Sequence, residues 1–168
     1  EGVNKLVPLI VINFAQKRLG VESFGYAQFG IALLEITIPF IIWGYHNYGI
    51  IELGKLKVTN NFNQASILIS NIVGAKVIHA LLAYVVLVLI IVFIPSYHKY
   101  FTIILALSFV LISTALDGVW ILIAIQQVTV LSIITFIGRF LSLLCIVFLI
   151  SKPEHAVLYA VLTLMSNA

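Results

Sequence analysis

The stretch that decides the fold is residues 67–94, which read ILISNIVGAKVIHALLAYVVLVLIIVFI. This run is far too long and too apolar for a helix of a soluble protein, and Lys76 and His79 lie within it. A helix needs about 20 residues to cross the hydrocarbon core at ~1.5 Å per residue. The stretch therefore predicts a membrane-spanning helix, in which the charge of Lys76 is costly unless something offsets it.

Composition extends this interpretation to the whole chain. Hydrophobic residues make up 62% and charged residues only 9%, and the mean hydropathy is +1.20. Such a chain has too little polar surface to cover a globule in water, so we expect an all-α integral membrane protein. The sequence has no phosphate-binding loop, no Cys/His metal spacing and no run of basic and aromatic residues, so an enzyme, a metal site and nucleic-acid binding are not expected. The single cysteine, Cys145, is interpreted as a packing residue.

Short polar segments divide the chain into six apolar runs. They are residues 6–18, 24–45, 67–94, 101–125, 128–150 and 156–168. The four central runs are long enough to cross a membrane, whereas the first and last are short, and we interpret the chain as a fragment of a longer protein. Residues 46–66 are polar and predict the only loop long enough to hold structure outside the bilayer. The sequence thus predicts a polytopic bundle of transmembrane helices.

Polar side chains recur within the four central runs at spacings of three, four and seven, which fall on one face of a helix. The four stripes are Gln28, Glu35, Pro39 and His46; Lys76, His79 and Ala83; Ser113, Asp117, Trp120 and Ala124; and Ser132, Thr135, Arg139 and Ser142. They predict a shared polar interior. Small residues on such stripes are also typical of the seams where membrane helices pack closely, and Trp120 is expected to pack.

The charges on these stripes have two interpretations. Glu35, Lys76, Asp117 and Arg139 balance to zero, so they could form two structural ion pairs. Alternatively, some of them line a water-filled pathway, because ionisable groups inside membranes usually mark the routes of substrates or protons. His79, one turn from Lys76, could relay protons or could be a hydrogen-bonded bystander. The residues alone leave these alternatives open.

A further set of features is a series of short patterns in a fixed order. They are Leu19-Gly20 followed by Phe24-Gly25, the segment GYHNYGIIELGK at residues 44–55, Ala75-Lys76, Trp120 and Arg139. Together they resemble the multidrug/oligosaccharidyl-lipid/polysaccharide (MOP) exporter superfamily, in particular its polysaccharide (O-antigen, Wzx-like) flippases. The sequence departs from the usual patterns of that family in three places, at residues 13–15, at Trp43 and at residues 122–124.

The resemblance implies a multi-pass protein of the bacterial inner membrane with two pseudo-symmetric helix bundles. This chain would be most of the first, a MOP/MATE-like N-terminal half with a cytoplasmic N-terminus. Such proteins move an undecaprenyl-pyrophosphate-linked oligosaccharide to the periplasmic leaflet during the biosynthesis of O-antigen, lipopolysaccharide or capsule. The implied partners are the lipid-linked oligosaccharide, membrane lipids and the polysaccharide polymerase and glycosyltransferase machinery. No cofactor is expected, and coupling to a proton or sodium gradient is left open.

Within this framework the charged residues acquire expected roles. The anionic headgroup would be bound by the basic residues Lys76, Arg139, Lys17 and Arg18. Coupling or ion pairing would fall to Glu35, Asp117 and His79. Two other functions compete with this one: export of drugs or cations by a member of the same superfamily, and a non-transporting membrane scaffold whose ion pairs only specify helix packing.

Overall fold

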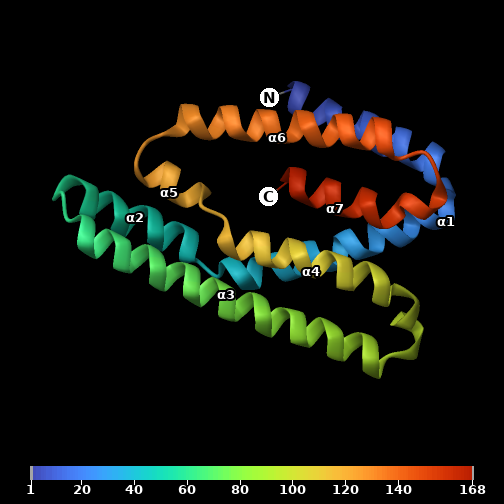
Figure 1. The fold of residues 1–168 in the computed structure, drawn as a ribbon, viewed down its shortest axis with the longest axis horizontal. Coiled ribbons are helices and arrows are strands. Elements are labelled where there is room, and N and C mark those ends of the chain that lie inside the picture. Colours follow the sequence, from blue (N-terminus) through green and yellow to red (C-terminus); the bar gives the residue numbers. More distant parts are fainter. Residues whose placement is uncertain (1, 168) are drawn as a thin grey trace.

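A computed structural model describes the course of the chain over residues 2–167 and the side chains of residues 11–165. The described chain is helices joined by short turns and contains no strand (Figure 1). Its α-helices are α1 (Gly2–Ile42), α2 (Tyr45–Val58), α3 (Phe62–Phe93), α4 (Phe101–Leu116), α5 (Val119–Ala124), α6 (Val128–Leu149) and α7 (Ala156–Asn167). Two short 3-10 helices, η1 (Pro95–Tyr100) and η2 (Pro153–His155), precede α4 and α7.

Four helical stretches of the described chain are long and apolar enough to span a membrane. They are Val11–Val58, Phe62–Phe93, Pro95–Ala124 and Val128–Leu149. Their outward surfaces carry many exposed large apolar side chains, such as Leu81, Val85 and Leu89 on α3, which suit contact with lipid rather than with water. The all-α class and the membrane character predicted from the sequence are therefore confirmed.

Helix α1 consists of two helical arms that meet at Gly20. This residue has φ 77° and ψ 164°, a backbone conformation that is open essentially to glycine alone. The first arm, drawn in dark blue in Figure 1, runs away from the N-terminus, and the second arm returns in the opposite sense. The first two apolar runs of the sequence are thus joined by a single glycine rather than by a loop.

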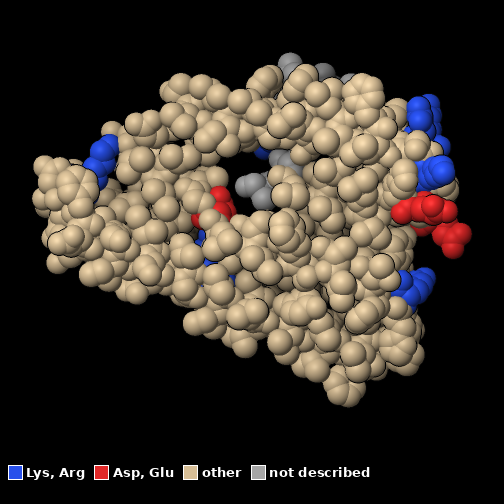
Figure 2. All heavy atoms as spheres, in the orientation of Figure 1, with Lys and Arg blue, Asp and Glu red and all other residues tan. Residues whose placement is uncertain are grey.

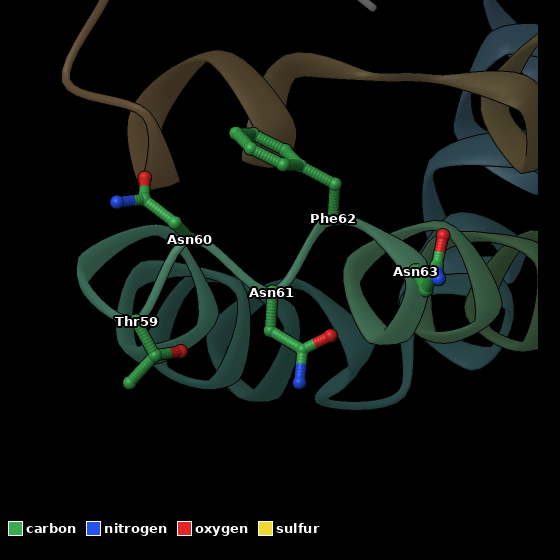
Figure 3. Close-up of a pocket in the computed structure, with 5 residues that line it drawn as sticks. All are labelled: Thr59, Asn60, Asn61, Phe62 and Asn63. Atoms are coloured by element: carbon green, nitrogen blue, oxygen red, sulfur yellow. The ribbon is translucent and has the colours of Figure 1, made fainter.

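The expected loop at residues 46–66 is mostly helical, so this part of the prediction is wrong. Helix α2 follows two residues with positive φ, Trp43 (32°) and Gly44 (78°), and buries Gly49 and Leu53 against its neighbours. The true turn is short and lies at the end of α2. A shallow surface pocket there is lined by Thr59, Asn60 and Asn61 of the turn and by Phe62 and Asn63, the first residues of α3 (Figure 3). Asn61 ends the turn by accepting a hydrogen bond from the Gln64 amide through its side chain, which caps α3.

The expected single helix over residues 101–125 is also interrupted. Helix α4 ends before Asp117, whose ψ of 124° leaves the helical region, and α5 starts after Gly118. Lys57 of α2 reaches across to the end of α5, where its Nζ donates to the Ile125 carbonyl at 2.6 Å. The fourth span is therefore made of two helices of unequal length.

The buried side chains form two separate hydrophobic clusters. The larger cluster joins α1, α4, α7 and the second part of α3, and the smaller one consists of Leu53, Ile72, Trp120 and Ala124 with partly buried neighbours. Along α1–α2 and along α4–α5, the change from one cluster to the other coincides with the helix break. We call α2, α5 and residues 62–72 of α3 the α2–α5 module.

Candidate functional site

Lys76 lies where the two clusters meet on the uninterrupted helix α3. Its side chain is only 3% exposed, and its Nζ donates a hydrogen bond to the backbone carbonyl of Asp117 at 3.1 Å. An ammonium group has three donors, and this carbonyl is the one acceptor found for it among the described residues. A cation in the middle of a membrane helix is expensive, so this arrangement indicates a specific role for Lys76.

The Asp117 break is built from replacement hydrogen bonds. In a continuous helix the Asp117 carbonyl would accept from the Ile121 amide, and the Val119 amide would donate to the carbonyl four residues earlier. Instead the Ile121 amide donates to the Gly118 carbonyl at 2.9 Å, and the Val119 amide donates to Asp117 Oδ1 at 3.0 Å. Lys76 supplies the donor that the Asp117 carbonyl has lost. Such compensation is needed because the hydrocarbon offers no water to unpaired backbone groups.

His79 lies one turn beyond Lys76 but turns back onto its own helix. Its Nδ1 lies 2.9 Å from the Ala75 carbonyl oxygen, so this nitrogen donates. Its ring meets the edge of the Tyr45 ring at the start of α2, with centroids 5.6 Å apart. The structure therefore places His79 beside the α1–α2 break, half-buried, close along the chain to Lys76.

Arg139 is exposed although it lies on the face of α6 that points toward the rest of the protein. The less exposed residues Leu131, Thr135, Ser142 and Ile146 mark that face, and Arg139 falls in the same stripe by its spacing of three, four and seven. Figure 2 shows a hollow below α6 with acidic and basic atoms on its walls. No hydrogen bond or ion pair is found for Arg139 within the described part of the chain.

The two structural ion pairs that the sequence allowed are not formed. In the described residues the one ion pair joins Lys55 and Glu52 at 2.7 Å, at the surface of α2. Glu35 is exposed on α1, where Gln28 on its predicted stripe donates to the Tyr159 hydroxyl of α7 at 3.3 Å. Among the described side chains within the spans no direct ion pair is formed, although the Asp117 carboxylate lies close enough to Lys76 to interact with its charge.

Lys17 and Arg18 lie apart from Lys76, at the end of the bundle near Gly20. Both are exposed, and the Arg18 guanidinium lies 5.0 Å from the centroid of the Phe14 ring. The same end carries η1 and η2, and Figure 2 shows that charged side chains gather along this edge. An aromatic group of Tyr26, Phe29, Tyr97 and Tyr100 stacks there. Basic and aromatic residues together are typical of the membrane–water interface.

One contact of the α2–α5 module was missed by sequence reasoning. Trp120 is fully buried, as its expected packing role requires, and its ring lies against Gly49 so closely that an added Cβ would fall 2.5 Å from Cε3. In the sequence, Gly49 stands out only as part of the segment at residues 44–55. The preference for Gly49 has a physical reason, because nothing larger fits beside the ring.

These features define a polytopic α-helical membrane protein with ionisable residues inside its spans. No known protein family, no curated protein and no solved structure matches this chain. Its function is therefore argued from its own residues.

Proposed function

We propose that this protein flips an anionic, lipid-linked oligosaccharide across the bacterial inner membrane, with undecaprenyl pyrophosphate as the carrier. The observation that supports this most is Lys76, a buried cation whose one hydrogen-bond acceptor among the described residues is a neutral carbonyl, with the Asp117 carboxylate near enough to interact with its charge but not paired with it. A pyrophosphate cannot cross hydrocarbon unaided, and charge-assisted hydrogen bonds are the strongest that a protein can offer it. Lys76 would supply them near the middle of the membrane.

Arg139, exposed on α6, would supply a second counter-charge. Its planar guanidinium suits bidentate binding to phosphate oxygens. Thr135 and Ser142 share its helix face and would meet sugar hydroxyls. Lys17 and Arg18, at the end of the bundle, would assist entry or release of the headgroup. Because Asp117 is engaged in the helix break, Glu35 and His79 are the better candidates for coupling to a proton or sodium gradient.

The test is removal of charge in the intact protein, in a bacterial strain that depends on it for surface polysaccharide. We expect Lys76→Ala and Arg139→Ala each to lower surface polysaccharide by about tenfold or more, the effect of losing one charge-assisted contact, while the lipid-linked precursor accumulates. Lys99→Ala and Lys152→Ala remove exposed lysines at the bundle end and serve as controls. Unchanged polysaccharide in the Lys76/Arg139 double variant would refute the proposal.

A scaffold that transports nothing is the competing function, because Lys76 already has a structural partner at the Asp117 break. It predicts that replacing Lys76 and Asp117 together by apolar residues leaves activity unchanged. Energised export of a cationic dye by the intact protein would instead favour a drug exporter.

A further inference from the structure

The geometry points to a two-state hinge at Asp117 that Lys76 holds in its bent state, with α2 and α5 moving together when the hinge straightens. This inference concerns the fold and does not depend on what the protein transports. It is argued from the hydrogen bonds of the break, from a second break at the same level, and from the contacts inside the α2–α5 module.

The bent and straight states differ by few hydrogen bonds. Asp117 has ψ 124°, whereas Gly118 has φ −103° and ψ 10°, which is close to helical. Rotation of ψ at Asp117 toward about −42° would let its carbonyl accept the Ile121 amide in a continuous helix. Both states satisfy the backbone in lipid, so neither is excluded. The bond from Lys76 belongs to the bent state alone.

The α1–α2 connection provides the second pivot. Trp43 and Gly44 both have positive φ there, and α2 leaves the direction of α1 at this point. The two breaks lie on the same boundary between the hydrophobic clusters, so a rotation about that boundary separates few buried side chains. Helix α3 crosses the boundary near Gly74, where an added Cβ would meet nothing within 4 Å.

Helices α2 and α5 are joined firmly enough to move as one body. The Trp120 ring of α5 packs directly on Gly49 of α2, and Lys57 of α2 holds the Ile125 carbonyl at the end of α5. Both helices also share the smaller hydrophobic cluster. A short turn of residues 125–127 joins α5 to α6, so straightening of the α4–α5 break would also move the start of α6.

The experiment measures distances between spin labels in the intact protein in lipid vesicles, with Cys145 replaced by alanine. One label pair, Thr102→Cys and Gln127→Cys, brackets the break, and both positions are exposed. In the otherwise native protein we expect a short distance. Lys76→Met should raise the longer population by about tenfold or more, since it removes a charge-assisted bond. That population should approach about 33 Å, the length of a continuous helix from residue 102 to the end of α5 at ~1.5 Å per residue.

A rescue variant and a control variant complete the test. Gly118→Pro should return the Lys76→Met protein to the short distance, because a residue before proline favours the extended backbone that Asp117 already has. Lys99→Met, which removes a lysine lying over the Tyr100 ring, should leave the distances unchanged. Identical distributions in the Lys76→Met and native proteins would overturn the hinge.

A second label pair, Asn47→Cys and Gln127→Cys, tests the joint motion of α2 and α5. Asn47 is exposed on α2, and Gln127 follows the end of α5. We expect this distance to be the same in the native and Lys76→Met proteins, because both labels travel with the α2–α5 module. A shift as large as that of the first pair would overturn the joint motion.

Discussion

Replacement of Lys76 by methionine tests whether Lys76 serves the stability of the protein or its activity. Methionine has nearly the same length as lysine and no charge, so it fills the buried site without leaving a cavity. The substitution loses the charge-assisted bond to the Asp117 carbonyl, worth about 1.5–3 kcal/mol. It also removes the cost of a cation at the centre of a membrane helix, about 2.5–3.5 kcal/mol.

The free energy lost with the hydrogen bond and the free energy gained by removing the buried charge nearly cancel. We therefore expect Lys76→Met to range from unchanged to about 2 kcal/mol more stable than the native protein. Lys76→Ala should be less stable than Lys76→Met by about 2 kcal/mol or more, because it leaves a cavity. Under the proposed function, surface polysaccharide should fall by about tenfold or more in both variants.

The assay is unfolding of the purified protein by sodium dodecyl sulfate in mixed micelles, followed by tryptophan fluorescence, to which the fully buried Trp120 contributes. Circular dichroism on the same samples checks that helix content is retained before unfolding. A Lys76→Met protein more than about 2 kcal/mol less stable than the native one would refute the reasoning, since Lys76 would then be mainly structural.

Three other predictions concern packing, backbone and topology. Gly49→Ala should lower the free energy of unfolding by about 1–3 kcal/mol, because its Cβ would lie 2.5 Å from the rigid Trp120 ring. Gly20→Ala should cost about 1–3 kcal/mol in the same assay, because φ 77° with ψ 164° strains any side chain. Single cysteines at Asn63 and Lys152, in a protein without its native cysteine, should react with an impermeant maleimide from opposite sides of the membrane.

The two glycine predictions have control variants, and the labelling prediction has a result that would contradict it. Gly54→Ala, also on α2, should be nearly neutral because its Cβ would meet only the Ala124 carbonyl oxygen at 4.0 Å. Gly25 lies in a regular helix with open space around it, so Gly25→Ala should leave the free energy of unfolding unchanged or raise it slightly. Equal losses in each glycine and its control would contradict the packing and backbone arguments. Labelling of both cysteines from one side would contradict the path of the spans.

Predictability from sequence was highest where apolar runs lie between clear polar turns. Residues 128–150 became α6 and residues 67–94 became most of α3, because hydrophobic length alone determines such helices. Ser132, Thr135, Arg139 and Ser142 do share one side of an unbroken helix, but Ser132 and Arg139 are exposed, so the predicted polar interior stays a prediction.

The errors arose where local structure depends on distant residues. Helix α2 is polar enough to resemble a loop, and its buried positions Gly49 and Leu53 have partners on α3 and α5. The Asp117 break depends on Lys76, which lies 41 residues earlier. The predicted stripe of Ser113, Asp117, Trp120 and Ala124 consequently does not follow one helix face, because the break falls within it.

The shortness of α5 has a consequence for how the chain enters its membrane. A helix of six residues does not persist alone, and its free backbone ends are costly in lipid. Its stabilising partners on α2 and α3 are synthesised earlier, so they can already be inserted when residues 119–124 leave the ribosome. We therefore expect the fourth span to stay incomplete beside the insertion machinery until the α2–α3 hairpin receives it.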